Sequence, residues 1–362
     1  MREREMDYVQ HNPVPLPESG AFQKVKSTVN AVFDWQYALE QKKLLNLYEK
    51  GKNLQWNASD LDWSIDVDIE RMSHDTDAAA FINDVLKPPR TLSKEEGVVY
   101  RVHSNAFMLS QFLHGEQGAL MAAAKIVQTV PSEEAKFYAA NQVADEARHV
   151  EVYHRYLTEK LGVSYGLHPS LGQLLDDIIT DERWDVTYLG MQIMVEGLAL
   201  AAFGLLRMTT QNEPLIQDIT KRIMADEARH VAFGVMSLQD LYTGEMSAQE
   251  LKDREGFVIE ATRLLHDRLI ATPVFERLGW DDPAWIEWNR NNPMNVGFRQ
   301  MMFSKIVPNL RRLGLLTPEV RKAFADLDLL RFEHLQDSVE EPGVTPPAEL
   351  VQMLMERLQP AS

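Results

Sequence analysis

The heptapeptide Ala-Asp-Glu-Ala-Arg-His-Val occurs twice in the chain, at residues 144–150 and again, without a change, at residues 225–231. Each copy contains a Glu and a His three positions apart: Glu146 with His149, and Glu227 with His230. Positions i and i+3 of an α-helix share one face, so both side chains can bind the same metal ion. The two copies therefore predict two metal-binding helices and indicate two ions.

The composition is that of a globular protein without thiol ligands. Apolar residues make up 45% and charged residues 25% of the 362 positions, which allows a sizeable core. The chain has no Cys, so a metal must be held by carboxylate oxygen and imidazole nitrogen. A net charge of −17 opposes binding to nucleic acid and to anionic membrane surfaces.

Two features of the sequence bear on the expected cellular location: the N-terminus and one apolar stretch. The N-terminus has neither the apolar region of a signal peptide nor the acid-poor character of a transit peptide, so we expect a cytoplasmic protein. Residues 188–206 are apolar apart from Gln192 and Glu196. Because a lipid-facing carboxylate would be costly, we expect a core helix that is buried on all sides rather than a membrane span.

Helix signals dominate the rest of the chain, and strand-like alternation is scarce. We expect an irregular arm over residues 1–27 and a first helix over residues 28–48. Ser93-x-x-Glu96 and Ser247-x-x-Glu250 are capping boxes that should open helices towards residues 128 and 270. Further helices are expected over both copies of the heptapeptide and over residues 183–208, 296–313 and 318–330.

These elements predict an all-α protein, a four-helix bundle with accessory helices at both ends. The expected single domain spans residues 28–335, with a metal-binding core over 93–243 and accessory helices over 248–335. Residues 336–362 should form a tail with a short helix. The two heptapeptides start 81 residues apart, which fits a duplicated helix pair better than a solenoid repeat.

Two further carboxylates are expected to point into the bundle. Glu116 has the apolar neighbours Phe112, Ala119 and Leu120 at i−4, i+3 and i+4, so its helix face is the buried one. Glu196 lies in a helix without a polar side. One Glu from each of two helices and one Glu-x-x-His from each of the other two make up the ligand inventory of a di-iron or di-manganese carboxylate centre. Four carboxylates would also neutralise two divalent ions.

A single Glu-x-x-His pair on an amphipathic helix is more often a solvated pair than a ligand pair. The repetition and the two inward acids favour the metal site, and a zinc site or a purely structural site is the alternative. Metal-bound imidazoles usually donate their second N–H to a carboxylate. Asp145 and Asp226 are the candidates, each serving the His of the opposite copy, with Arg148 and Arg229 as their partners.

The repeated Asp-Glu-x-Arg-His and the segment Gly115-Glu116-Gln117-Gly118-Ala119 resemble the ferritin-like di-iron carboxylate superfamily, in its oxygen-activating branch. The resemblance covers about residues 93–242 and is strongest to hydroxylase α-subunits of multicomponent monooxygenases, with acyl-carrier-protein desaturases and N-oxygenases as relatives. It implies six protein ligands: Glu116, Glu146, His149, Glu196, Glu227 and His230. The chain departs from the hydroxylases at Leu200, where they commonly have Thr, and from the N-oxygenases at Ile223, where they have an extra His.

Two more positions resemble another branch of the superfamily. Tyr153 follows His149 by four residues, where small subunits of ribonucleotide reductase keep a radical Tyr. The segment Gln55-Trp56-Asn57-Ala58-Ser59-Asp60-Leu61-Asp62 is similar to the corresponding segment of reductase-like ligand-binding oxidases. The alternative for Tyr153 is a buried Tyr that merely finds a hydrogen-bond partner.

The function expected from these patterns is a non-haem di-iron oxygenase or oxidase that uses dioxygen to hydroxylate or N-oxygenate a small organic substrate. Its cofactor would be two iron ions or a manganese–iron pair. Helical spacing offers Phe112, Ala119, Gln192 and Leu200 as walls of an apolar substrate pocket, or as plain core. The resemblance implies an electron donor such as a ferredoxin or a flavin reductase, and a homodimer. The alternatives are a radical-generating or ligand-binding oxidase and a ferritin-like ferroxidase.

Overall fold

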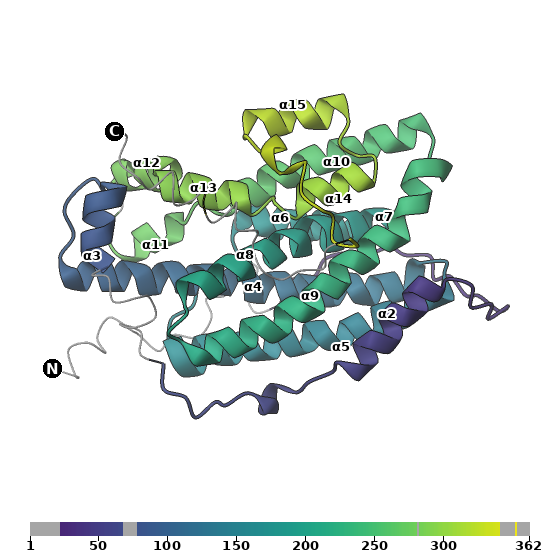
Figure 1. Ribbon diagram of the computed structural model, residues 1–362, viewed down its shortest axis with the longest axis horizontal. Coiled ribbons are helices and arrows are strands. Elements are labelled where there is room, and N and C mark those ends of the chain that lie inside the picture. Colours follow the sequence, from purple (N-terminus) through teal and green to yellow (C-terminus); the bar gives the residue numbers. More distant parts are fainter. Residues whose placement is uncertain (1–21, 68–77, 281, 341–351, 353–362) are drawn as a thin grey trace.

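The computed structural model describes residues 22–67, 78–280, 282–340 and 352, and these residues form helices and connections without a strand. Four long helices make the central bundle (Figure 1): α4 (Lys94–Thr129), α5 (Glu133–Arg155), the continuous helix Trp184–Thr209 and α9 (Pro214–Asp240). Helix α4 packs along α5, the helix Trp184–Thr209 packs along α9, and α5 contacts α9. The predicted all-α, ferritin-like four-helix bundle is confirmed.

The third helix of the bundle is the apolar one. It consists of α7 (Trp184–Tyr188), the π-helical segment η6 (Leu189–Val195) and α8 (Glu196–Thr209). The helix is long and apolar enough to cross a membrane, but 89% of its most apolar window is buried inside the bundle. Burial of this extent is typical of a core helix and agrees with the expectation from the sequence.

The predicted helix starts rest on side-chain capping. The Ser93 hydroxyl accepts from the Glu96 N–H at 3.2 Å, and the Glu96 carboxylate accepts from the Ser93 N–H at 2.9 Å. Ser247 and Glu250 form the same pair of bonds at the start of α10 (Ala248–Asp267). Each box satisfies two N–H groups that lack partners in the helix, so both predicted starts are confirmed.

Shorter helices surround the bundle. Helix α2 (Lys42–Asn53) packs on α5 and α9, while α6 (Pro169–Thr180) and α10 pack against each other and cover α4 and η6. The remaining helical elements are η2 (Ala58–Asp60), α3 (Ala78–Phe81), η4 (Ile82–Leu86), η5 (Tyr156–Leu161), η7 (Leu241–Glu245), α11 (Thr272–Arg277), α12 (Pro283–Asn291), α13 (Pro293–Met301), α14 (Ile306–Arg312), α15 (Pro318–Asp326) and η8 (Leu330–Phe332).

The helix predicted over residues 28–48 is wrong for most of its length. Residues 22–40 contain no helix, and the first described helix, α2, begins at Lys42. Tyr37 has a φ of 52°, which a continuous right-handed helix does not allow. Phe33 and Trp35 remain 69% and 73% exposed, so this segment buries no apolar stripe that would stabilise a helix. The stripe exists only in α2, where Leu44 and Leu47 are buried.

The helix predicted over residues 296–313 is two helices. Helix α13 ends at Met301 and α14 begins at Ile306, and the turn between them contains the fully buried Met302 and Phe303. The apolar pattern continues through this turn, so periodicity alone does not reveal the break. Helices α11 and α12 were missed because they are short, although both have Pro in their first turn.

The terminal predictions fall largely outside the described residues. This applies to residues 1–21 of the predicted arm and to most of the predicted tail helix within 336–362. Residues 22–27 of the arm are described, and they form neither helix nor strand.

Substitution of Gly234 by Ala is expected to destabilise the bundle by about 1–3 kcal/mol. A Cβ at Gly234 of α9 would lie 2.6 Å from the Cβ of Gln192 in η6, and a change of rotamer cannot move that atom. Urea unfolding should show the loss, whereas Gly115→Ala, where a Cβ meets nothing within 4 Å, should not destabilise the protein. Equal stabilities of the two variants would contradict this packing.

Candidate metal centre

The four helices of the bundle each bring acidic or imidazole groups into the interior. Glu116 comes from the middle of α4, and Glu196 is the first residue of α8, directly after the π-helical segment. The two heptapeptides lie in the middle of α5 and α9. All six predicted ligands are at most 5% exposed: Glu116, Glu146, His149, Glu196, Glu227 and His230.

The donor atoms of these residues form two groups that share one carboxylate. Within each group every donor lies within 4.8 Å of the others. The first group contains Glu116, Glu146, His149 and Glu227; the second contains Glu146, Glu196 and His230. Because donors around one metal ion must approach each other at such distances, the six residues can hold two neighbouring ions.

Glu146 and Glu227 each lie between the two imidazoles and turn opposite oxygens towards them. Glu146 places Oε2 3.3 Å from His149 Nδ1 and Oε1 3.1 Å from His230 Nδ1. Glu227 places Oε1 3.2 Å from His149 Nδ1 and Oε2 3.6 Å from His230 Nδ1. Two carboxylates with this placement can bridge two ions.

Glu116 and Glu196 take the outer positions of the cluster. Glu116 Oε2 lies 3.3 Å from His149 Nδ1, and the donors of Glu196 group with His230 and Glu146. Each ion would therefore have one imidazole, one carboxylate of its own and two shared carboxylates. Two ions held in this way would keep coordination positions for other ligands.

Several of the candidate ligand atoms are buried without a hydrogen-bond partner, which suits metal ligands. Among the described residues, no hydrogen-bond partner reaches Glu146 Oε2, Glu196 Oε2, His230 Nδ1 or either oxygen of Glu227. Buried polar atoms without partners are rare, since each costs free energy, and a buried carboxylate costs much more than a neutral group. Divalent cations between these atoms would satisfy them.

Burial and mutual repulsion raise the pKa values of two of the acids, and a bound metal ion would lower them again. Burial, followed by the negative charge of Glu227, raises the pKa of Glu116 well above its ordinary value. Burial and the charges of Glu227 and Glu146 likewise raise the pKa of Glu196. These shifts oppose the ionised form of both acids, and bound cations would favour it.

The imidazoles compensate part of the central charge. Burial alone would lower the pKa of His149, but the charge of Glu116 and the bonds to Asp226 and Glu116 outweigh it and raise this pKa. The pKa of His230 is raised in the same way, chiefly by Glu146. Burial would raise the pKa of Glu146, but the charges of His230 and His149 hold it below its ordinary value.

The two Asp residues of the heptapeptides lie behind the imidazoles in a crossed arrangement. His149 Nε2 lies 3.2 Å from Asp226 Oδ2, and His230 Nε2 lies 3.2 Å from Asp145 Oδ2. Because a carboxylate accepts, each Nε2 carries a proton, so a metal ion that displaces the other proton would find the Nδ1 lone pair directed towards it. Arg148 donates to Asp145, and Arg229 donates to Asp226. These are the partners that the sequence predicts.

Substitution of Asp226 or Asp145 by Asn is expected to weaken metal binding by about 10–100-fold, as removal of such outer partners typically does. The amide keeps the size of the side chain but no longer favours the Nε2–H form of the imidazole. A Mn²⁺ titration followed by electron paramagnetic resonance measures the change. Asp240→Asn, at the exposed last residue of α9, is the matched control. Unchanged affinity in both site variants would contradict the role of these Asp residues.

The structure adds two neighbouring residues that the sequence did not assign to the site. Trp56 Nε1–H donates to Asp226 Oδ2 at 2.8 Å, and Gln55 Nε2–H donates to Asp145 Oδ1 at 2.7 Å. Both follow α2, so one short segment holds both Asp–His pairs. The sequence resemblance pointed to this segment, but only the packing of α2 on α5 and α9 shows what it contacts.

Gln142 is another residue of the site that the sequence did not reveal. Its Nε2 donates to Glu146 Oε1 and to Glu196 Oε1, both at 2.9 Å, and its Oε1 lies 3.4 Å from Gln192 Nε2. Gln142 precedes Glu146 by one helical turn, which was the available signal. The amide holds both carboxylates in place: Glu196 Oε2 stays without a hydrogen-bond partner among the described residues, and Glu146 Oε1 keeps a second lone pair for a metal.

Tyr153 lies beside the cluster. It is fully buried, its hydroxyl has no hydrogen-bond partner among the described residues, and its ring lies 6.1 Å from the ring of Phe112 and 6.0 Å from that of Phe203. Burial and the charge of Glu116 raise the pKa of its hydroxyl well above the ordinary value. Tyr153 is therefore a neutral phenol, and it lacks the partner that a buried structural Tyr usually has.

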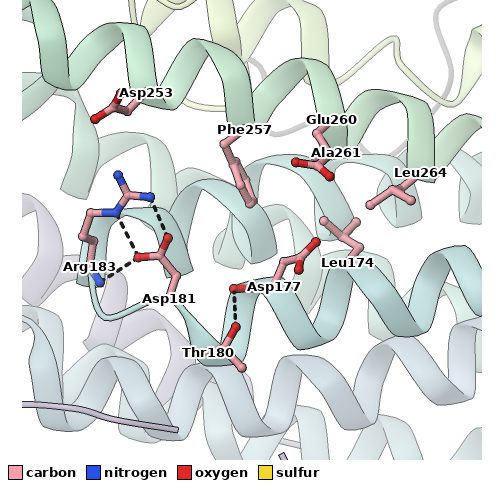
Figure 2. Close-up of a pocket in the computed structure, with 10 residues that line it drawn as sticks. All are labelled: Leu174, Asp177, Thr180, Asp181, Arg183, Asp253, Phe257, Glu260, Ala261 and Leu264. Atoms are coloured by element: carbon pink, nitrogen blue, oxygen red, sulfur yellow. Dashed lines mark hydrogen bonds and ion pairs between the residues drawn. The ribbon is translucent and has the colours of Figure 1, made fainter. Parts of the chain in front are cut away.

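The predicted pocket walls Phe112, Ala119, Gln192 and Leu200 are all buried, at 5% exposure or less. Phe112 packs edge-to-face on Phe203 at 4.7 Å. A cavity of about 370 Å³ lies elsewhere, between α6 and α10, and includes none of these residues (Figure 2). Their role as substrate walls stays a prediction.

Comparisons with known proteins give one family. A family model described as "Protein of unknown function (DUF455)" matches residues 48–265. No curated protein matches the chain in sequence.

Solved structures with a similar fold share little sequence. An R2-like ligand-binding oxidase with a reconstituted Mn/Fe cofactor is 18% identical, with a TM-score of 0.45, over 77% of this chain and 94% of that chain. Dimanganese(II)-NrdF from Streptococcus sanguinis is 14% identical, with a TM-score of 0.48, over 81% of this chain and 99% of that chain. Sequence identities and TM-scores at this level do not establish a shared chemistry.

Proposed function

The chain belongs to the DUF455 family of proteins of unknown function, and for this member we propose a two-metal oxidoreductase that uses dioxygen to oxidise a small organic substrate. The matched region, residues 48–265, includes all six ligand residues, Gln142, Tyr153 and the segment with Gln55 and Trp56. The finer form of the proposal is a monooxygenase that hydroxylates or N-oxygenates its substrate.

One observation carries the proposal: two buried carboxylates, Glu146 and Glu227, each turn one oxygen to His149 and the other to His230. A site for one structural ion has no need of two shared carboxylates. Together with Glu116 and Glu196 they supply four negative charges, which two divalent ions neutralise. Bound iron, or a manganese–iron pair, would supply the electrons that reduce dioxygen.

The residues of the chain hold and shield this centre. The crossed Asp–His pairs fix both imidazoles, and Gln142 fixes the carboxylates of Glu146 and Glu196. Burial of all six ligands excludes bulk water, which protects reactive species from side reactions. We place the organic substrate on the side of Phe112 and Tyr153, whose apolar rings pack together.

Oxygen chemistry at such a centre needs electrons from outside. Trp56, Asp226 and His149 form a continuous hydrogen-bonded chain that leads from a ligand towards the α2 side of the bundle. Arg148 and Arg222 lie over the Trp56 ring, with guanidinium carbons at 4.8 and 5.6 Å from its centroid. We propose this side for an electron donor such as a ferredoxin or a flavin reductase.

Stopped-flow absorbance tests the proposed function. The anaerobically iron-loaded chain is mixed with air-saturated buffer, and a transient band that decays in the presence of substrate analogues is expected. Glu151→Ala, on the exposed face of α5, should behave like the original protein. A chain that binds two irons but stays colourless and consumes no dioxygen would rule out the oxidase and leave a structural metal site.

A second function, generation of a protein radical, is favoured by the unpartnered hydroxyl of Tyr153. A phenol without a hydrogen-bond partner beside a redox centre can lose an electron only if its proton also leaves, and Glu116 and Glu227 are the acids whose charges act on its hydroxyl. Electron paramagnetic resonance after aerobic metal loading should then show a tyrosyl signal that Tyr153→Phe removes. Absence of the signal in the original chain would exclude this function.

A further inference from the structure

Arg268 is a buried cation that has no partner in the described part of the chain. It follows the last residue of α10 and is 3% exposed. Among the described residues, none forms a hydrogen bond or an ion pair with its side chain, and its Nε is a buried donor without an acceptor. Burial lowers the pKa of this guanidinium to about 10, so it stays protonated at neutral pH. The Arg268 side chain is not among the residues of the metal centre described above.

The neighbouring acid does not neutralise Arg268. The side chain of Asp267 is 63% exposed, and its carboxylate lies 3.5 Å from the ring of His266. Buried Arg residues normally pair with carboxylates, because an uncompensated buried charge is costly. The chain carries a net charge of −17, so a lack of acids cannot explain the unpaired site.

The antiparallel packing of α6 and α10 places Arg268 at the start of α6. In Figure 2, Asp253 near the start of α10 lies beside Arg183, just beyond the end of α6, while Leu264 lies beside Leu174. Continuing in this register by one to two turns brings the C-terminal end of α10 to the N-terminal end of α6, near residue 168. The electrostatic influence of Arg268 on His168 agrees with this placement.

The first turn of α6 is suited to an anion. The positive end of the dipole of α6, a helix of twelve residues, lies there. His168 is the N-cap, and its Nδ1 accepts from the Ser170 N–H at 3.2 Å. The remaining ring nitrogen, Nε2, therefore carries the proton and can donate. Burial and the charge of Arg268 lower the pKa of His168, which keeps the ring neutral.

We propose that the N-terminal end of α6, with Arg268 and His168, binds a small oxyanion, namely the phosphate or carboxylate group of a ligand. The guanidinium supplies two parallel donors that match either group, and His168 Nε2–H supplies a third. The bound anion would neutralise Arg268 and interact favourably with the positive end of the helix dipole.

This site is separate from the metal ligands but shares helix α4 with them. Gln111 of α4 donates to the Gly166 carbonyl and accepts from the His168 N–H, and it precedes Phe112 in the chain. An anion at α6 would thus lie against the same segment of α4 that leads to Glu116. The inference does not depend on the proposed oxidase chemistry.

Thermal unfolding of the full, metal-loaded chain tests the site, with inorganic phosphate and acetate as separate probes in buffer free of other oxyanions. One of the two anions should raise the unfolding midpoint in a saturable manner, and the effective anion identifies the ligand class. Arg268→Met should weaken the apparent affinity at least about tenfold, as expected for loss of a charge-assisted bond. Arg263→Met, at an exposed position of the same helix, should leave the affinity unchanged.

The stability of Arg268→Met without anion separates a binding role from a structural one. A purely structural Arg would be needed for folding, and its loss would lower the midpoint in every buffer. An Arg that awaits a ligand is an uncompensated charge, so Arg268→Met should unfold at the same or a higher midpoint in oxyanion-free buffer. No effect of either anion on the original chain, or equal effects in Arg268→Met, would overturn the proposal.

Discussion

Replacement of Glu146 by Ala is expected to reduce the metal content from two ions per chain to less than one. The Glu146 carboxylate turns one oxygen to His149 and the other to His230, at 3.3 and 3.1 Å, so its loss removes a ligand from both ions. Loss of an outer partner alone costs about 10–100-fold in metal affinity, and loss of a direct, shared ligand should cost more. Metal analysis after anaerobic reconstitution and desalting measures the result.

The matched control is Glu151→Ala, which removes an acid five residues later on the exposed side of the same helix. This variant should retain two ions. Circular dichroism must show that both variants are helical, because a misfolded chain would lose metal for another reason. Retention of two ions by the folded Glu146→Ala variant would contradict the shared position of this carboxylate.

Removal of the metal is the second change with a large expected effect. The metal-free cluster buries four acids, and several of their oxygens have no hydrogen-bond partner among the described residues. At a free metal concentration about 1,000 times the dissociation constant, each ion adds about 4 kcal/mol to the free energy of unfolding. Two ions would add about 8 kcal/mol, which corresponds to a rise of about 10 °C in the midpoint for a chain of this length.

Calorimetry of the metal-loaded and chelator-treated chain checks this expectation. Glu146→Ala should show little difference between the two conditions, because it no longer holds the pair of ions. The Gly115→Ala variant, whose added Cβ meets nothing within 4 Å beyond its chain neighbours, should show the full difference. Equal midpoints of the loaded and metal-free original chain would mean that metal binding and folding are not coupled.

The sequence predicted the fold through its repeats and caps. Two identical heptapeptides identified α5 and α9, and the capping boxes at Ser93 and Ser247 located the starts of α4 and α10. The inward position of Glu116 followed from its apolar neighbours, since helical spacing determines which residues share a face. The position of Glu196 followed because its helix has no polar side.

Contacts between distant segments could not be predicted in this way. Gln55 and Trp56 lie 90 and 170 residues from the Asp residues that accept their hydrogen bonds, and no local pattern encodes these pairs. Arg268 looks like any surface Arg in the sequence, because its burial appears only in the folded structure. The wrong helix over residues 28–48 has the same origin, since its apolar residues find no surface to pack on in the described structure.

The most direct test of the two-metal centre is anomalous X-ray diffraction from crystals of the iron-loaded chain, recorded at the iron absorption edge. The structure predicts two anomalous peaks, with Glu146 and Glu227 between them, one peak beside His149 and the other beside His230. A single peak, or peaks away from these side chains, would contradict the central claim.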